Sequence, residues 1–219
     1  FVADWDRALF IHYEVDPVVL QREVPFQLDL LDGRAYVSLV AFTLRDFRFR
    51  FGGALGGWLV KPIANHTFLN VRTYVRHRGE SGILFLAEWL SNPMSVLLGP
   101  RTFGLPYRFG RIDYQHRHET GMLRGNVAAV GSELELTYEA RIEANPEFEI
   151  CPSGSLDDFL LERYTAFTAR GNKRGFFRIW HEPWPQIPVS VVIQKDELLA
   201  ETFGWFKTAN LVGANYSTG

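Results

Sequence analysis

Short strand-like segments at close spacing dominate this chain, and they constrain its fold more than any other feature of the sequence. Ala35–Phe42, Phe68–His77 and Ile83–Leu90 are rich in the apolar, aromatic and β-branched residues that are typical of strands. Asp32-Gly33 is a residue pair that favours a tight hairpin turn before the first of them. Many strands at short spacing favour a curled or closed sheet over a doubly wound parallel one. Further strands are expected at Arg7–Tyr13, Arg111–His118, Leu123–Val130, Glu133–Ile142, Gly175–Trp180 and Val189–Ile193.

Helix signals are few by comparison. A capping residue followed by proline predicts short helices after Asp16 and after Asn92. Ser155, with Asp158 three residues later, resembles a capping box, and apolar side chains recur on one helical face beyond it. We therefore expect a longer helix over Ser155–Thr168. The sequence as a whole predicts one domain over residues 1–219, of α+β class and mostly antiparallel β.

The charge balance and the cysteine count exclude several classes of partner. Charged residues make up 22% of the chain and the formal net charge is -2, so we expect no nucleic-acid partner, which needs a basic face. No apolar run has the length that spans a membrane, so no membrane partner is expected. Cys151 is the only cysteine, which excludes an intramolecular disulfide and a cysteine-rich zinc site. This cysteine usage fits a reducing compartment, and we expect a cytoplasmic protein.

A polar face on one predicted strand is the first candidate for a binding site. Asn70, Arg72 and Tyr74 alternate with other residues, so their side chains share one face of the strand, and Phe68 shares it too. The aromatic ring on this face indicates partial enclosure. An enclosed arginine needs an anionic partner, which is either a carboxylate of the same protein, with Glu88 on the next strand available, or the carboxylate of a ligand.

Histidines offer a weaker case for a metal or for acid–base catalysis. His116 and His118 lie two apart in a predicted strand beside Glu119, and His181 could complete a ligand set. The spacing is common and the set is incomplete, so we favour an ordinary polar strand face and predict no metal. His181 can act as a general acid or base, but packing between tryptophans at a strand end is the favoured interpretation. The glycine-rich stretch Phe51–Gly57 lacks the following helix of a phosphate-binding loop and is interpreted as a mobile loop.

Three motifs in order carry a resemblance to a known family. The segments 70–75 (NVRTYV), 159–164 (FLLERY) and 181–185 (HEPWP) resemble those of the YqjF-like family of unknown function, over roughly Arg7 to Trp184. That family is more distantly similar to the acetoacetate decarboxylase superfamily. The resemblance implies a cone-shaped, closed β-barrel with a central cavity, a few flanking helices and assembly into a homo-oligomer.

The same resemblance marks a departure in chemistry. Gly99–Arg108 is similar to the decarboxylase segment in which two lysines follow a proline, but Tyr107 and Arg108 stand in their places here. Neither residue forms an imine with a ketone, so no Schiff-base decarboxylase is expected. Counting along the matched strands puts Ser38 and Phe68 where the enzyme has its two buried glutamates. The resemblance therefore implies an apolar cavity lined by arginine and tyrosine, suited to a small organic acid or a keto-acid-like ligand.

Three hypotheses remain open at this point, and no cofactor is expected in any of them. The first is an enzyme of lyase or hydratase type, with Tyr107, Arg108 and Arg72 as its catalytic residues. The second is a non-catalytic ligand-binding protein, and the third is a structural protein whose arginines form internal ion pairs. Arginines that line a cavity favour the first two hypotheses, and arginines locked against carboxylates favour the third. The residues expected to contact the ligand are Ser38, Phe68, Asn70, Tyr74, Glu88, Arg163 and His181.

Overall fold

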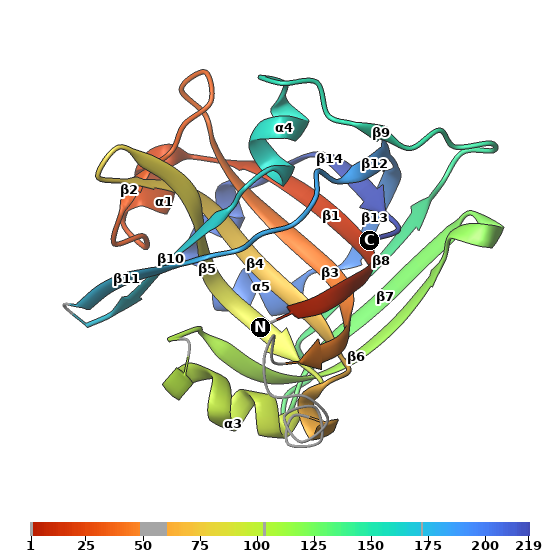
Figure 1. Cartoon of the computed structure of the whole chain (residues 1–219), viewed down its shortest axis with the longest axis horizontal. Coiled ribbons are helices and arrows are strands. Elements are labelled where there is room, and N and C mark those ends of the chain that lie inside the picture. Colours follow the sequence, from red (N-terminus) through yellow and green to blue (C-terminus); the bar gives the residue numbers. More distant parts are fainter. Residues whose placement is uncertain (1, 49–60, 103, 172) are drawn as a thin grey trace.

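One long and strongly curved β-sheet forms most of the molecule (Figure 1). The computed structural model describes residues 2–48, 61–102, 104–171 and 173–219. The expected loop at Phe51–Gly57 lies outside these residues. Neighbouring strands are mostly antiparallel, and among the described strands only the β5–β6 and β5–β10 pairs are parallel. The strands are β1 (Val2–Val15), β2 (Gln27–Leu28), β3 (Ala35–Arg48), β4 (His66–His77), β5 (Glu80–Leu90), β6 (Tyr107–Arg117), β7 (Met122–Ala129), β8 (Glu135–Arg141), β9 (Glu149–Ile150), β10 (Thr165–Arg170), β11 (Lys173–Arg178), β12 (Pro185–Pro188), β13 (Ser190–Lys195) and β14 (Asn210–Ser217).

The hydrogen-bonded order of the strands is β13-β8-β7-β6-β5-β4-β3-β1-β14-β12-β9. No ladder joins the two ends of this order within the described residues, so the expectation of a closed barrel is not confirmed. β12 and β13 are separated only by Val189, whose N–H donates to the carbonyl oxygen of Ala214 in β14 at 2.9 Å. Pro185 and Pro188 lack the N–H groups that a longer ladder along β12 would need. The sheet is curled, and the single residue Val189 connects β13, at one end of the order, to β12, next to the other end.

The helices are short, and two of them begin at the capping residues that the sequence predicts. Asp16 accepts hydrogen bonds from the N–H groups of Val18 and Val19, with Pro17 in the first turn. Asn92 accepts in the same way at the start of α3. The helices are α1 (Pro17–Gln21), α3 (Pro93–Thr102), α4 (Leu156–Leu161) and α5 (Glu197–Thr202), with 3-10 turns at Lys61–Ile63, His118–Thr120 and Gly204–Thr208. No helix in the described part of the chain is long and apolar enough to cross a membrane.

The long helix expected over Ser155–Thr168 is wrong in its second half. Ser155 caps α4 as expected, its Oγ accepting from the N–H of Asp158 at 3.1 Å, but α4 ends at Leu161. The chain then extends as β10, which pairs with β11 on one side and with β5 on the other. Thr165 and Thr168 are β-branched and favour extended backbone, and pairing on both sides supplies the backbone hydrogen bonds that a helix would otherwise make.

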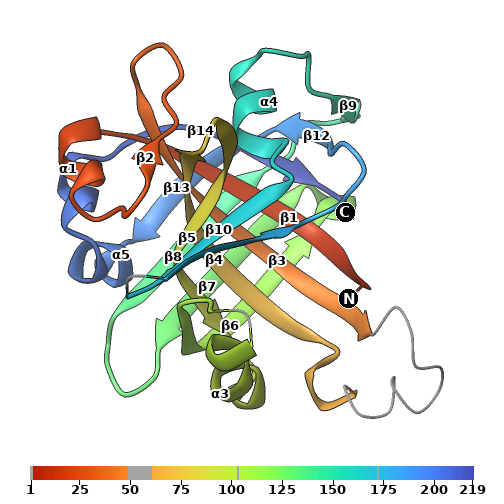
Figure 2. The ribbon, with the colours of Figure 1, turned by 60° about the vertical axis from the view of Figure 1, so that its left-hand side comes forward.

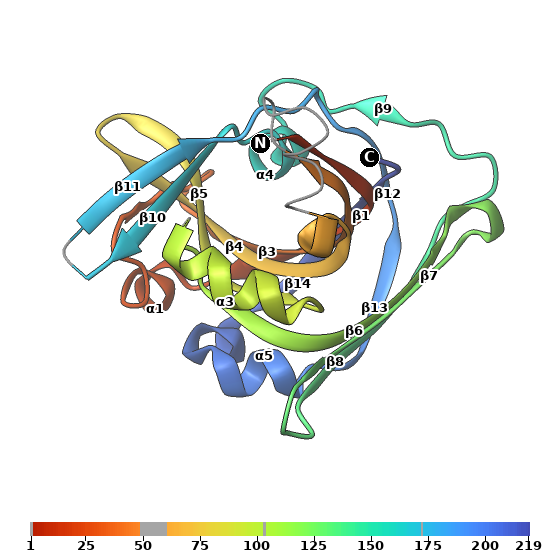
Figure 3. The ribbon, with the colours of Figure 1, turned by 60° about the horizontal axis from the view of Figure 1, so that its bottom comes forward.

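Strands β1, β3, β4 and β5 form a wall that is buried on both sides. We call the side covered by α4 and Trp184 the α4 face, and the opposite side the α5 face. Strand alternation sends Val37, Leu39 and Ala41 of β3 to the α5 face, where a large apolar core lies. Figure 3 shows β3 and β4 as one curved layer and β6 to β8 as a second, and this core fills the space between them. A second apolar core lies on the α4 face and surrounds the polar residues described below.

The first and last strands of the chain, β1 and β14, lie side by side (Figure 2). β14 pairs antiparallel with β1, and the N–H of Arg7 donates to the carbonyl oxygen of Thr218 at 3.0 Å. This pairing brings residues from opposite ends of the sequence onto the same wall. Asn215 of β14 consequently faces the same interior as His12 of β1.

Candidate functional site

Two neighbouring rungs of the wall carry four of the ten predicted site residues on the α4 face. Register places Ser38 opposite both His12 and Arg72, and it places Asn70 opposite Glu88. Tyr74 lies two residues beyond Arg72 on the same face of β4. All of these side chains are at most 4% exposed. We call this set the Arg72 cluster; its members are His12, Ser38, Asn70, Arg72, Tyr74 and Glu88.

A chain of hydrogen bonds runs through one half of the Arg72 cluster. Ser38 Oγ lies 2.7 Å from His12 Nδ1 and 2.5 Å from Tyr74 Oη. His12 Nε2 lies 3.0 Å from Asn215 Oδ1, and Asn215 Nδ2 donates to Gln186 Oε1 at 2.6 Å. Burial, followed by the charge of Arg72, lowers the pKa of His12 to about 3. This half of the cluster is therefore a connected network around a neutral imidazole.

The other half of the cluster carries buried polar atoms without partners. Within the described residues, Asn70 Oδ1, Arg72 Nε and Glu88 Oε2 make no hydrogen bond. Buried polar groups are nearly always paired, because an unpaired one costs about 1–3 kcal/mol. Three of the seven such atoms in the described residues lie together here, which makes this half of the cluster a candidate for ligand binding.

Arg72 is the strongest of these signals. Its Nη2 donates to the carbonyl oxygen of Leu160 at 2.9 Å, and its guanidinium lies 5.6 Å from the centre of the Phe10 ring. It forms no ion pair with any carboxylate in the described part of the chain. Glu88, the internal partner that the sequence offered, does not fill that role, and burial alone raises the pKa of Glu88 to about 8.

Glu88 and Tyr107 form a pair of neutral donors at the edge of the cluster. They are opposite each other in the parallel β5–β6 ladder, and the N–H of Glu88 donates to the carbonyl oxygen of Pro106. Burial, followed by the neighbouring Glu88, raises the pKa of Tyr107 above its ordinary value. Gly99 allows this arrangement, because a Cβ there would lie 2.0 Å from the Tyr107 ring.

Three of the predicted residues are not brought into the cluster. Arg108 follows Tyr107 in a strand, so its side chain points to the opposite face, where it is exposed and stacks 5.3 Å from Trp89. Arg163 lies near Tyr74 but is held by Asp29 at 3.1 Å. His181 stacks on Tyr164, and its Nδ1 lies 2.7 Å from the carbonyl oxygen of Glu182. Phe68 lies on the α4 face as expected and packs there against Phe42.

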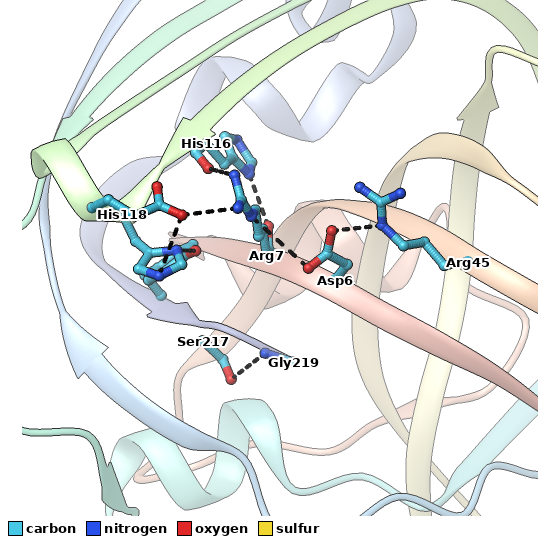
Figure 4. Close-up of polar contacts among 9 residues, drawn as sticks. Asp6, Arg7, Arg45, His116, His118, Ser217 and Gly219 are labelled. Carbon is cyan, nitrogen blue, oxygen red and sulfur yellow. Dashed lines mark hydrogen bonds and ion pairs between the residues drawn. The ribbon is translucent and has the colours of Figure 1, made fainter.

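A second polar cluster involves the histidines that were considered as metal ligands. The bulge in β1 gives Arg7 a positive φ of 57° and turns its side chain toward β6 (Figure 4). Arg7 donates to the carbonyl oxygen of His116 at 2.8 Å and to Glu119 Oε1 at 3.0 Å. His116 in turn bonds the carbonyl oxygen of Arg7 and the hydroxyl of Tyr138, each at 2.8 Å. We call Arg7, His116, Glu119 and Tyr138 the His116 cluster.

His118 begins a 3-10 turn instead of continuing the strand, and it meets this cluster only at its rim, where its Nε2 lies 3.7 Å from Glu119 Oε1 (Figure 4). Its Nδ1 lies 3.3 Å from the hydroxyl of Tyr216. Within the described residues, no three histidine, cysteine or carboxylate side chains converge as a metal site would require. Cys151 is buried in the α4-face core, and burial raises the pKa of its thiol to about 11.

A pocket of about 560 Å³ lies beside the cluster, between α3, β5 and β10. None of the residues predicted for the site lines it. Three of its lining residues nevertheless border the cluster: Phe85 is opposite Arg72 in the β4–β5 ladder, Pro106 bonds Glu88, and Leu105 belongs to the α4-face core. Phe85, Leu105 and Pro106 therefore stand between the pocket and the cluster.

Comparison with solved structures defines the class of the fold. The chain resembles acetoacetate decarboxylase from Legionella pneumophila with a TM-score of 0.64 at 15% identity, covering 98% of this chain and 81% of that one. It also resembles the enduracididine biosynthesis enzyme MppR complexed with pyruvate, with a TM-score of 0.62 at 12% identity, covering 97% and 83%. The fold is thus acetoacetate decarboxylase-like.

Sequence comparison assigns the family. The model of DUF2071, described as "Uncharacterized conserved protein (COG2071)", matches residues 2–211, so the chain belongs to that family. The "Uncharacterized protein YqjF" of Bacillus subtilis (strain 168) is 31% identical over 183 residues, which cover 82% of this chain and 72% of that protein. The resemblance stated from the three motifs is confirmed.

Sequence reasoning missed His12, Asn215 and Gln186. His12 is the only polar residue within the apolar stretch Leu9–Tyr13 of β1, and that interruption was a usable signal. Asn215 and Gln186 carried no comparable signal, because only the β1–β14 pairing brings Asn215 to His12, 203 residues away.

Proposed function

We propose that this protein binds a small keto acid at the Arg72 cluster and acts on it without forming an imine. The reaction class we propose is a lyase- or hydratase-type step that passes through the enol form of the ligand. The observation that carries this proposal is Arg72, a buried cation with no carboxylate partner in the described part of the chain. A ligand carboxylate supplies the missing charge and pairs with the guanidinium in the geometry that arginine favours.

The spacing of the rungs supports a ligand of a few carbon atoms. Arg72 and Glu88 are diagonal neighbours on the sheet, and such positions lie about 7–8 Å apart. A ligand whose carboxylate meets Arg72 reaches the Asn70–Glu88 pair with its carbonyl end. The unpaired Glu88 Oε2, when protonated, donates to the ketone oxygen of that end, and Asn70 Oδ1 accepts from the hydroxyl of the enol once it has formed.

The chemistry of Glu88 supports stabilisation of an enol. A carboxyl group whose pKa is about 8 is protonated at neutral pH and can donate to the ketone oxygen of the ligand. Tyr107, also kept protonated by burial, is a second donor beside it. A donor aimed at the oxygen where negative charge develops lowers the barrier to enolisation.

The comparisons support the ligand class, and the lysines support the exclusion of an imine. One structural neighbour, MppR, is described as complexed with pyruvate, and another is an acetoacetate decarboxylase. All four lysines of this chain are exposed. A Schiff-base mechanism needs a desolvated amine inside the site.

Calorimetric titration with pyruvate and acetoacetate tests the proposal, with acetone as a neutral control ligand. We expect binding of the acids only, and we expect Arg72→Met to weaken it about 10- to 100-fold, because one charge-assisted pair is lost. Arg108→Met is the matched control, since it removes an arginine from the opposite face, and its affinity should equal that of the wild type. Equal affinity in wild type and Arg72→Met, or no binding of either acid, contradicts the proposal.

Borohydride treatment in the presence of pyruvate, followed by mass spectrometry, tests the absence of an imine. We expect the intact mass to stay unchanged, and a reduced adduct on any lysine would overturn that part of the proposal. Turnover that is lost in Tyr107→Phe while binding is kept distinguishes an enzyme from a plain binding protein. The cytoplasmic location and the homo-oligomeric state expected from the sequence belong to this proposal as well.

A further inference from the structure

We propose that Tyr74 is the proton acceptor of this site, that Ser38 and His12 form the relay that takes its own proton away, and that Asn215 fixes the tautomer of His12. This inference rests on the proposed function, because the proton in question comes from the keto acid bound at Arg72. The four side chains form one unbroken series with separations of 2.5, 2.7 and 3.0 Å. None of them is more than 3% exposed, so water does not compete for their hydrogen bonds.

The direction of the hydrogen bonds in this series follows from Asn215, the residue farthest from Tyr74. Asn215 Nδ2 donates to Gln186 Oε1, so the atom that Asn215 turns to His12 is the acceptor Oδ1. His12 must then carry its hydrogen on Nε2, and a neutral imidazole leaves Nδ1 as an acceptor. Ser38 consequently donates to His12, and its oxygen is free to accept from Tyr74. Each bond in the series points from Tyr74 toward His12.

The Tyr74 hydroxyl can donate to Ser38 without leaving another buried group unpaired. This hydroxyl also lies 2.8 Å from the carbonyl oxygen of Leu160, but Arg72 already donates to that carbonyl. The Tyr74 hydrogen can therefore turn to Ser38 without leaving the carbonyl unpaired. Ser38 itself has neighbours on both sides at hydrogen-bond distance, which makes it a relay and leaves no open position for it to attack a substrate.

Ligand binding switches the relay on through Arg72. Burial and the charge of Arg72 are the two causes that lower the pKa of His12, and Arg72 is the only charged side chain among those causes. A bound carboxylate neutralises the second cause, so the imidazole accepts a proton more readily when the site is filled. Tyr74 from β4, Ser38 from β3 and Asn215 from β14, the other side chains facing His12, are neutral groups.

The proton transfer balances as follows. The C–H bond beside the ketone breaks, and its proton goes to Tyr74 Oη while the Tyr74 proton moves to Ser38 and the Ser38 proton to His12 Nδ1. The electron pair moves to the ketone oxygen, which takes the proton of Glu88. The products are the enol, a Glu88 carboxylate and a His12 imidazolium. Reversal after exchange with solvent returns the ketone with a solvent hydrogen on carbon.

A measurement on the ligand-free protein tests the direction of the relay. Nitrogen-15 NMR of the histidine rings, with the His12 signals assigned by their loss in His12→Gln, reports which ring nitrogen carries the hydrogen. We expect a neutral ring with hydrogen on Nε2 at pH 7. Hydrogen on Nδ1 reverses the series and overturns the proposal, whatever ligand the protein binds.

A second measurement tests the proton transfer itself. Proton NMR in D₂O follows the replacement of the methyl hydrogens of pyruvate by deuterium. We expect wild type to catalyse the exchange, and His12→Gln to lower its maximal rate about 100-fold or more while KM changes less than about threefold. The pH profile should lose its ionisation on the acid side in the same variant. His77→Gln, which removes a histidine farther along β4, is the control and should exchange like wild type.

The outcomes separate the two proposals. Failure of pyruvate to bind contradicts the proposed function, and the ring measurement still decides the relay. Binding without exchange, or equal exchange in His12→Gln, leaves the keto-acid site standing and overturns the relay. Loss of both binding and exchange in His12→Gln would show a merely structural histidine, and Tyr74→Phe then decides whether the hydroxyl takes part at all.

Discussion

The Arg72 cluster and the His116 cluster both bury a histidine, but they differ in what surrounds it. His116 donates from Nδ1 to a backbone carbonyl and accepts from Tyr138 at Nε2, so its tautomer is fixed by a group that cannot reverse. His12 has the Asn215 amide at Nε2 and the Ser38 hydroxyl at Nδ1, and the hydroxyl hydrogens on the Nδ1 side can be rearranged. The first arrangement holds a β-bulge in place, and the second can conduct a proton.

The two clusters also differ in completeness. Within the described residues, every buried side-chain nitrogen and oxygen of the His116 cluster has a partner, whereas Asn70, Arg72 and Glu88 each retain a buried atom without one. Hydrogen bonding of every buried polar group favours stability, and natural proteins depart from it mainly at functional sites. The contrast supports the assignment of a structural role to one cluster and of a binding role to the other.

The largest expected effect is a fall in the free energy of unfolding as pH rises, which arises from the Arg72 cluster and not from the His116 cluster. The pKa of Glu88 is raised to about 8 in the folded protein, so between its ordinary value of 4.5 and 8 the unfolded chain ionises and the folded one does not. Stability therefore falls as pH rises through this window, by up to about 5 kcal/mol, and Glu88→Gln removes the loss. Urea unfolding of both proteins at pH 6.5 and pH 8 measures the part of this loss that lies above the windows of the buried histidines. The His116→Gln control should keep the alkaline loss, since the pKa of His116 is lowered to about 4 and its window lies on the acid side. If the free energy of unfolding depends on pH in the same way in wild type and Glu88→Gln, Glu88 is not the residue with the raised pKa.

The stability of two arginine variants compares a charge that is paired with a carboxylate, at Arg163, with one that is not, at Arg72. Arg163→Met leaves Asp29 buried with only Arg76 beside it, and should lower the free energy of unfolding by about 2–4 kcal/mol. Arg72→Met removes a cation that has no carboxylate partner, so it should change stability by less than about 1 kcal/mol or increase it. Thermal and urea unfolding of the two variants measure the difference. Equal losses would mean that Arg72 is a structural residue.

Strand alternation explains how much of the site was predictable from the sequence. A period of two puts Phe68, Asn70, Arg72 and Tyr74 on one face whatever the fold, and the structure has them there. The same rule separates Tyr107 from Arg108, and the family resemblance wrongly grouped them in one cavity lining. Local pattern is therefore reliable where the backbone alone sets the direction of a side chain.

Tertiary pairing explains what could not be predicted. The residues after Leu161 match a helical period, but β5 and β11 offer Thr165–Arg170 a place between them, and that pairing decides the outcome. Closure of the sheet likewise depends on how β12 and β13 meet, which no local pattern encodes. The relay from His12 to Asn215 joins β1 to β14 and exists only once the ends of the chain have met.

Two tyrosine variants, one in each cluster, test the same difference in hydrogen bonding through smaller changes in stability. Tyr138→Phe takes away the only partner of His116 Nε2 and should lower the free energy of unfolding by about 1–3 kcal/mol. Tyr74→Phe leaves Ser38 bonded to His12 and the Leu160 carbonyl bonded to Arg72, so the loss should stay below about 1 kcal/mol. Urea unfolding at pH 7 compares them. A larger loss for Tyr74→Phe would reverse the roles assigned to the two clusters.

The smallest expected effect concerns the outermost contact of the His116 cluster. Glu119 is 57% exposed and its ion pair with Arg7 is open to solvent, so water and salt screen most of the attraction. Glu119→Gln should shift the melting temperature by less than about 2 °C, and the shift should vanish in 1 M sodium chloride. Differential scanning calorimetry at low and high salt measures it. A large, salt-independent loss would mean that the β1 bulge is held from the surface. The expected result instead assigns that role to the bonds between Arg7 and the His116 backbone and ring, which are more buried than the ion pair and therefore less sensitive to salt.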